Sequence, residues 1–419
     1  MTKRVVITGL GAITALGEGA VPLWQAVLEG RSAIDFVDFE SGSEKWKSIG
    51  ALIRDFVPEK FVTQRKALKV MARDIQLAVA GASLAMEDAG TKNLGYDPER
   101  FGVIVGSGVL NHELDELSYS VQNSLNQEGG LDLNRFGYDG LSALFPLWLL
   151  KYLPNMPACH ISILFDLRGM NNTLTTGPSA GLQAVGEAFR IIQRGDADLM
   201  LAGGAESKLN PVGLSQYKIL GVLSDSEKDP KKNYRPFDAS SNGLVVGEGA
   251  GFLVLEELEH AKKRGAKIYA EITGFGSSYA RGHRIAMQAA MKEAQLTVKE
   301  ISYMQASGIG IAAEDRLEAQ AIHELFNGAG RQLHVSASKP ITGFTGFSSG
   351  ALDLILSTLA LKNQTIPAVM NFNRTEKEWG FEIVKGSAVS KKFEYAMTNS
   401  SGFNGQTVSV ITKSCGENR

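Results

Sequence analysis

Apolar residues along this chain follow two alternating patterns, short β-branched runs and longer stretches with helical spacing. The short runs predict buried strands at 5–8, 101–106, 198–202, 249–256, 270–275, 303–306, 333–336 and 408–412. The stretches with helical spacing or strong helix formers predict helices at 68–90, 179–194, 257–264, 285–296, 314–326 and 349–362. Strands that alternate with helices are typical of α/β proteins with mostly parallel sheets.

Residues 110–153 depart from this alternation. Leu110, Leu114 and Leu117 have the spacing of one helix face, and His112 lies on the same predicted helix. The polar, glycine-rich residues 123–140 predict a loop, whereas residues 141–153, which include Trp148, are strongly apolar. Two interpretations of the apolar stretch stay open: it fills the core, or it forms a subunit interface or the wall of a ligand tunnel.

Composition narrows the function classes. The 43 Lys and Arg residues nearly balance the 45 Asp and Glu residues, so the whole chain has no attraction for nucleic acid or an anionic membrane. Two cysteines, Cys159 and Cys415, are too few for a disulfide framework, which fits a reducing cytoplasm. No apolar run reaches the length of a membrane span, and the histidines lack metal-ligand spacing, so we expect neither a membrane anchor nor a metal. Gly9 and Gly11 lack the third glycine of a dinucleotide site.

Several motifs carry a resemblance to a known family. They are the opening run Val5-Val6-Ile7-Thr8-Gly9-Leu10-Gly11-Ala12, the signature Arg235-Pro236-Phe237-Asp238, and Val246-Gly247-Glu248-Gly249-Ala250-Gly251. Together they resemble the β-ketoacyl synthases, the condensing enzymes of fatty acid and polyketide synthesis. The resemblance implies the thiolase fold, an α/β fold of five αβαβα layers built from two similar halves, and a dimer. We place the halves at 1–256 and 257–413, followed by a tail at 414–419.

The position of the family's nucleophile is altered. Members of the family carry a cysteine in a turn at a helix N-terminus, where the helix dipole favours the reactive thiolate. Here the turn reads Thr176-Gly177-Pro178-Ser179, so Pro178 stands at the cysteine position. Proline has no nucleophile but suits the first turn of a helix. Ser179 fits a residue that stabilises a helix start better than a substitute nucleophile.

The two histidine positions of the family are altered as well. Ser307 replaces the first histidine, and Phe344 replaces the second. Neither side chain can donate a proton as an imidazolium does. Asp315, Glu318 and Lys339 match acidic and basic positions that the family retains, and we expect Lys339 to pair with Glu318 or Glu314.

The family's glycine-rich gating loop is kept in outline only. In this chain it reads Asn399-Ser400-Ser401-Gly402-Phe403-Asn404-Gly405. Ser401 occupies the position of the gating phenylalanine, Phe403 matches the next aromatic position, and Asn404 replaces a glycine.

The three replacements predict a protein without condensing activity. Ketosynthase-like proteins that lack the cysteine are known as chain length factors. They form a heterodimer with a catalytic ketosynthase, act with its acyl carrier protein, and shape the acyl tunnel that sets polyketide or polyene length. The better-known members carry glutamine where this chain has Pro178.

The resemblance also implies where such a subunit acts, without any cofactor. Residues 155–169 resemble the family's dimer-interface strand and the turn after it. The candidates for closing the tunnel are Leu110, His112, Leu114, Leu117 and Trp148.

Two other functions remain open. One is a malonyl-ACP decarboxylase that primes a synthase; such proteins keep their histidines to stabilise an enolate, so Ser307 and Phe344 argue against it. The other is a homodimeric binding protein for acyl thioesters. A basic run, Lys262-Lys263-Arg264, either docks an acidic carrier protein or is a solvated helix face.

Overall fold

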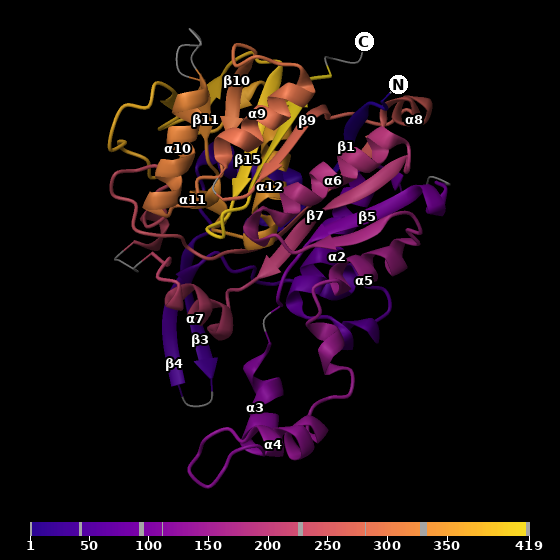
Figure 1. The fold of residues 1–419 in the computed structure, drawn as a ribbon, viewed down its shortest axis with the longest axis vertical. Coiled ribbons are helices and arrows are strands. Elements are labelled where there is room, and N and C mark those ends of the chain that lie inside the picture. Colours follow the sequence, from indigo (N-terminus) through magenta and orange to yellow (C-terminus); the bar gives the residue numbers. More distant parts are fainter. Residues whose placement is uncertain are drawn as a thin grey trace.

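The structure is a computed structural model that describes residues 2–41, 44–91, 96–110, 112–224, 229–280, 282–326 and 333–415. One large mixed sheet runs through the molecule (Figure 1). Its strands are β1 (Val5–Thr14), β2 (Gly17–Glu18), β5 (Phe101–Gly106), β6 (Asn171–Leu174), β7 (Leu199–Ser207), β8 (Glu248–Glu257), β9 (Ala270–Ser278), β10 (Ile301–Gln305), β11 (His334–Ser336), β13 (Glu382–Ile383), β15 (Tyr395–Ser401) and β16 (Thr407–Lys413). The strand order is β13-β11-β10-β15-β16-β9-β1-β8-β7-β5-β6, and β2 pairs with β1.

The two halves of this sheet repeat one topology. Read outward from the centre, the first half runs β1-β8-β7-β5-β6 and the second runs β9-β16-β15-β10-β11. When the two-residue strands β2 and β13 are left out and the others are numbered along the chain, each half has the strand order one, five, four, two, three. Antiparallel pairing of β1 with β9, which places Val5 opposite Ile272, joins the halves. The division of the chain at residue 256 stays a prediction.

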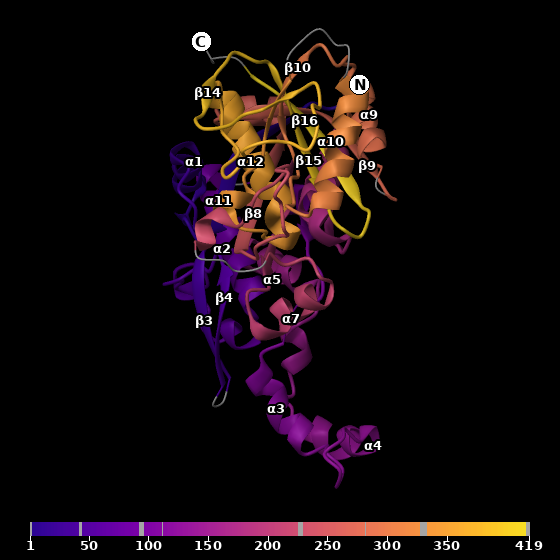
Figure 2. The same ribbon diagram turned by 90° about the vertical axis from the view of Figure 1, so that its left-hand side faces the viewer.

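Helices form three layers around the two half-sheets (Figures 1 and 2). In the middle, α6 (Ala180–Arg194) and α12 (Ser349–Asn363) contact each other and strands of both halves. On the outer faces, α2 (Arg73–Asp88) and α5 (Met156–Phe165) pack on the first half, and α9 (His283–Ala294), with α10 (Ala312–Phe326) beside it, on the second. Residues 349–361 of α12 are all buried, as a helix between two sheets requires. The expected five-layered thiolase fold is therefore confirmed.

Smaller elements complete the body. They are α1 (Ala20–Glu29), α7 (Pro211–Ile219), α8 (Leu258–Lys263), α11 (Lys339–Thr342), the hairpin of β3 (Asp35–Ser41) with β4 (Glu44–Gly50), and the pair of β12 (Thr365–Ile366) with β14 (Val389–Ser390). The predicted strands and helices listed above all occur, with shifted ends, whereas β6 and β15 were not predicted.

The predicted interface strand at 155–169 is wrong. Most of that segment is the helix α5, which has Pro157 in its first turn and ends at Asp166 in a left-handed conformation with φ 52°. An apolar run of this length fits a buried strand and a packed helix equally well, because periodicity cannot separate them. The strand at the sheet edge is β6, which begins two residues after Gly169.

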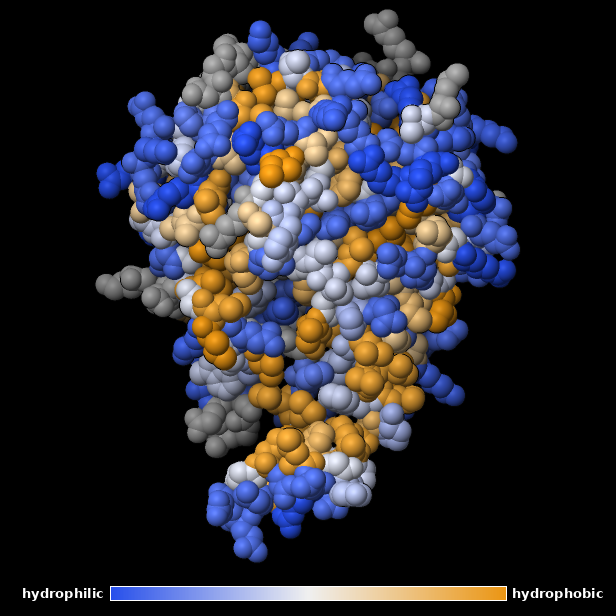
Figure 3. Space-filling view, in the orientation of Figure 1, coloured by the Kyte–Doolittle hydropathy of each residue, from blue (hydrophilic) through white to orange (hydrophobic). Residues whose placement is uncertain are grey.

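Residues 112–150, which we call the arm, extend away from the body in both ribbon views (Figures 1 and 2). The arm contains α3 (Leu114–Gln122) and α4 (Leu133–Arg135), so the predicted loop at 123–140 is partly helical, and Leu110 and His112 precede α3 instead of lying on it. Many of its apolar side chains are exposed: Leu131, Leu133, Tyr138, Leu141, Phe145, Leu147 and Leu149. Figure 3 shows hydrophobic surface where the arm meets the body. Most of the 141–153 stretch therefore does not fill this chain's core.

Candidate functional site

Pro178 lies in a short turn, Gly177–Ser179, that leads directly into α6. Its side chain is buried beneath the loop after β15, where a Cβ on Gly402 would lie 2.6 Å from Pro178 Cδ. Asn404 Nδ2 donates to the carbonyl of Thr176 at 3.2 Å and ties the same loop to the turn. The Ser179 hydroxyl also donates to that carbonyl, at 3.4 Å. Ser179 therefore does not cap a backbone N–H of α6 as expected, and its hydroxyl holds the turn before the helix instead.

Ser307 follows β10, and its hydroxyl oxygen accepts a hydrogen bond from the backbone N–H of Ser401 at 3.0 Å. The backbone N–H groups of Ser307 and Gly308 each donate at 2.9 Å to one oxygen of Glu318. Glu318, on α10, therefore holds the turn in place with both carboxylate oxygens. Ser307 is buried, so its side chain belongs to this closed network.

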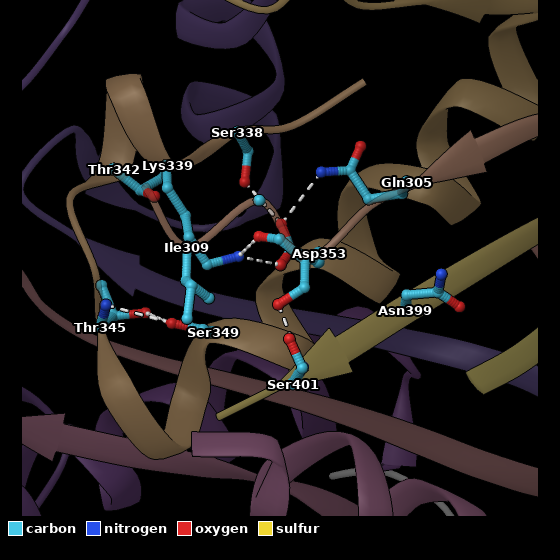
Figure 4. A network of polar contacts seen from close by, with 12 residues as sticks. Gln305, Ile309, Ser338, Lys339, Thr342, Thr345, Ser349, Asp353, Asn399 and Ser401 are labelled. Atoms are coloured by element: carbon cyan, nitrogen blue, oxygen red, sulfur yellow. Dashed lines mark hydrogen bonds and ion pairs between the residues drawn. The ribbon is translucent and has the colours of Figure 1, made fainter. Parts of the chain in front are cut away.

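Lys339 pairs with Asp353 on α12, and not with Glu318 or Glu314 as we expected (Figure 4). The Nζ to Oδ2 distance is 2.7 Å, and the two side chains are only 3% and 2% exposed. Lys339 Nζ also donates to the Ser307 carbonyl. Glu318 is already occupied by backbone N–H groups, which explains why the expected pairing fails.

Asp353 is a site residue that sequence reasoning missed. Its Oδ1 atom accepts hydrogen bonds from Gln305 Nε2 at 3.0 Å and from the Ser338 hydroxyl (Figure 4). The sequence did contain a signal: Asp353 is the one charged residue in the apolar run 350–361. A carboxylate in a fully buried helix requires a cation or several donors.

Phe344 is fully buried in an aromatic cluster. Its ring centroid lies 6.2 Å from that of Tyr217 and 6.4 Å from that of Phe403. Tyr217, which sequence reasoning missed, donates its hydroxyl to Glu206 Oε1 at 2.9 Å. An apolar ring surface therefore occupies the position that the second family histidine would take.

Phe347 fills space beside the start of α6. A Cβ on Gly108, just after β5, would overlap the Phe347 ring, and a Cβ on Gly181 in α6 would overlap its carbonyl oxygen. Phe347 itself is buried. The motifs gave no indication of this residue, because nothing in its local sequence shows which distant glycines leave room for the ring.

The loop 401–404 brings the three replaced positions together. Its Ser401 bonds to Ser307, its Gly402 packs on Pro178, and its Phe403 ring lies near Phe344. The three positions that the motifs singled out thus surround one loop, although they come from distant parts of the sequence.

Asp315 connects the 235–238 signature to the turn after β10. Its carboxylate accepts hydrogen bonds from the N–H of Phe237 at 2.9 Å and from the N–H of Gly310 at 3.1 Å. Burial raises the pKa of Asp315 to about 7, because its charged form loses hydration that these bonds replace only in part.

This shift predicts a pH dependence of stability. A carboxyl whose pKa is higher in the folded state binds more protons there, so stability falls as pH rises through 7 and is gained as pH falls from 7 towards 4. Between pH 6 and pH 8 we expect the contribution of Asp315 to fall by about 1 kcal/mol. Urea denaturation at both pH values should show a smaller pH-dependent loss in Asp315→Asn. An equal loss in both proteins would contradict the assignment.

The tunnel candidates lie at different depths. Leu110 is buried in this chain's core, whereas Leu114 is exposed and Leu117 is partly buried. His112 and Trp148 are partly buried, with ring centroids 4.8 Å apart. Only the partly or fully exposed members could touch a neighbouring subunit directly.

The remaining chemistry of the surface is limited. In the described part of the chain, no group of three or more His, Cys, Asp or Glu side chains could hold a metal ion. None of the helices described there is long and apolar enough to cross a membrane. In the basic run, Lys262 pairs with Glu259 at 2.8 Å on the exposed face of α8. Arg264 differs from the predicted solvated helix face, because it follows the end of α8 and pairs at 2.6 Å with the buried Glu256 of β8.

The fold and this site define a protein of the thiolase-like ketosynthase class. Family models extend the match along the chain: the model for the beta-ketoacyl synthase N-terminal domain matches residues 2–261, and that for its C-terminal domain matches residues 269–373. The chain therefore belongs to the beta-ketoacyl synthase family.

Similar proteins match over nearly full length. The chain is 33% identical to a 3-oxoacyl-[acyl-carrier-protein] synthase 2 of Vibrio harveyi, covering 99% of both chains, and 34% identical to that of Vibrio cholerae, covering 98% and 99%. Among solved structures, a beta-ketoacyl synthase from Burkholderia phymatum shares 30% identity with a TM-score of 0.85, covering 98% of this chain and 99% of that one. The ishigamide ketosynthase/chain length factor shares 27% identity with a TM-score of 0.84, covering 99% and 100%.

Proposed function

We propose that this chain is a chain length factor, a non-catalytic subunit that pairs with a catalytic ketosynthase and its acyl carrier protein and shapes the acyl tunnel. The observation that carries the proposal is the loop 401–404, which contacts Pro178, Ser307 and Phe344. None of these three residues is a nucleophile with a base, or a proton donor at neutral pH.

The contacts around the site support a loss of condensing chemistry. Acyl transfer needs a nucleophile, and decarboxylation of a malonyl group needs donors that stabilise the enolate. Pro178 offers neither, and Phe344 is surrounded by aromatic rings. Asp353 neutralises the charge of Lys339, and Phe347 fills space beside the α6 start. These contacts also disfavour the decarboxylase alternative, because they leave no donor to stabilise an enolate.

The surface supports assembly with a second subunit. Within the described residues, β6 has a strand partner, β5, on one side and stands at the end of the sheet order. Two apolar residues near it, Ile163 and Met170, are exposed, as is much of the arm. A free strand edge beside apolar surface favours pairing with another chain. One solved relative of this fold is named as a ketosynthase/chain length factor.

The first experiment tests for activity in the chain alone. Incubated with malonyl-ACP or an acyl-ACP, the purified chain should gain no acyl mass in intact mass spectrometry, and malonyl-ACP should stay intact. Pro178→Cys alone should gain no condensing or decarboxylating activity, because Ser307 and Phe344 provide no proton donor. Stoichiometric acylation or steady decarboxylation by the unaltered chain would contradict the proposal.

A second experiment tests whether the chain binds a catalytic ketosynthase. Co-expressed with a catalytic ketosynthase from the same source, the chain should co-purify as a one-to-one complex, and Ile163→Lys with Met170→Lys should weaken that complex. A stable monomer that does not bind the ketosynthase would contradict the proposal. A stable homodimer would favour the alternative function, a binding protein for acyl thioesters.

A further inference from the structure

The arm joins the body through a small cluster that we call the neck: His112, Glu116, Trp148, Lys151 and Tyr152. Glu116 lies in the first turn of α3, near the start of the arm, whereas Trp148 opens the short turn Trp148–Lys151, in which the arm ends and the chain re-enters the body. The His112 ring centroid lies 4.4 Å from that of Tyr152, and the Trp148 and Tyr152 centroids are 5.3 Å apart. Two of the five tunnel candidates, His112 and Trp148, therefore belong to the neck.

One carboxylate holds the polar side of the neck together. Tyr152 donates its hydroxyl to Glu116 Oε2 at 2.7 Å, and Lys151 Nζ pairs with Glu116 Oε1. The N–H of Glu113 donates to the Tyr152 oxygen at 3.4 Å. The Lys151 side chain is only 16% exposed and that of Glu116 is 32% exposed, so water screens this charged group incompletely. The first turn of α3 is thus bonded to the body through the Glu116 side chain.

The rest of the arm packs mainly on itself. The helices α3 and α4 both contact the turn at 136–140, and the side chains of Leu131, Leu133 and Tyr138 are exposed. The angle of the arm on the body therefore depends strongly on the neck. A loss of the Glu116 contacts would free the start of α3 and the nearby His112 ring, so that Trp148 would lose a fixed ring against which it packs.

We propose that Glu116, Lys151 and Tyr152 are positioning residues that hold the arm at one angle and so fix the depth at which Trp148 closes the partner's tunnel. The inference rests on the proposed function, and it adds a structural reason for a narrow distribution of product lengths. A wall held at one depth gives one main length, whereas a wall that moves gives several. The three residues act through Trp148 and do not touch the growing chain.

The variant that tests the neck is Tyr152→Phe, which keeps the ring and removes the hydroxyl. In the purified chain, amide hydrogen exchange of α3 should become about tenfold faster, the equivalent of one charge-assisted hydrogen bond. Tyr138→Phe, an exposed tyrosine of the arm, is the matched control and should leave exchange unchanged. Unchanged α3 exchange in Tyr152→Phe would overturn the proposed role of the neck without any reference to a partner.

The second measurement uses the complex with the catalytic ketosynthase and carrier protein. Tyr152→Phe and Glu116→Gln should at least double the fraction of products that are shorter or longer than the main one, while kcat stays within twofold. Faster exchange with an unchanged product distribution would overturn the inference and leave the proposed function standing. If Trp148 substitutions also leave product length unchanged in an intact complex, then the tunnel-shaping role itself fails, whatever the exchange result.

Discussion

Replacing Lys339 with methionine is expected to destabilise the fold by about 3–5 kcal/mol, the cost of removing one partner from a buried ion pair. The substitution leaves the Asp353 carboxylate charged and 2% exposed, with hydrogen bonds from Gln305 and Ser338 as its main compensation. It also removes the donor to the Ser307 carbonyl. Chemical denaturation at pH 7, compared with the unaltered chain, measures the loss.

Two controls separate the buried charge from the lost contacts. The double variant Lys339→Met with Asp353→Asn should regain much of the stability, because asparagine is uncharged and keeps an acceptor for Gln305 and Ser338. The exposed pair Arg316–Glu376, at 2.7 Å, is a matched surface control, and Arg316→Met should cost less than about 1 kcal/mol. A double variant as unstable as the single one would show that the charge is not the cause.

This expected effect bears on what the buried network does for the fold. The pair ties α11 to α12, and Asp353 reaches Gln305 at the end of β10. These three elements meet in the interior, so removal of any one of the three polar side chains leaves a buried polar group without its partner. Lys339, Glu318 and Asp315 therefore each have a structural role, since each holds backbone groups or a buried charge.

The alternation of apolar runs predicted most of the fold, and its failures have physical causes. The strand β15 was not predicted because its sequence, Tyr395–Ser401, is largely polar. It is nevertheless central in its half-sheet, where the polar side chain of Asn399 accepts a hydrogen bond from the Ser409 hydroxyl at 2.8 Å. The prediction at α5 is wrong because the resemblance to the family's interface strand was placed on residues 155–169, whereas the edge strand β6 begins only at Asn171.

The candidate site was predictable in its positions but not in its contacts. Motif spacing identified Pro178, Ser307 and Phe344, and the structure places all three around one loop. Spacing cannot show which acid among several reaches a lysine, so Asp353, which lies 14 residues after Lys339, was missed in favour of Glu318 and Glu314. It also cannot show that Leu110 is buried in the body, since that depends on how the arm leaves it.

The second large effect is expected from Trp148. If the chain closes a tunnel in its partner, Trp148→Ala should lengthen the products of the complex, because it removes a large ring from the partly buried surface of the neck. Each methylene that finds room is worth about 0.8 kcal/mol, so space for two or three carbons would move the main product to a longer length. Turnover should persist, because under the proposed function Trp148 closes the far end of the tunnel and takes no part in the chemistry.

The choice of Trp148 over Leu110 follows from burial. Leu110 is 1% exposed within this chain, so Leu110→Ala would chiefly create a cavity and cost about 2–5 kcal/mol of stability. Leu133→Ala, at an exposed position farther along the arm, is the matched control and should leave product length unchanged. The measurement is the product distribution of the reconstituted complex by mass spectrometry. If Trp148→Ala and Leu133→Ala give the same distribution as the unaltered complex, then the tunnel ends elsewhere. The next residue to substitute is then Leu114, which is exposed and adjoins the neck at the start of α3.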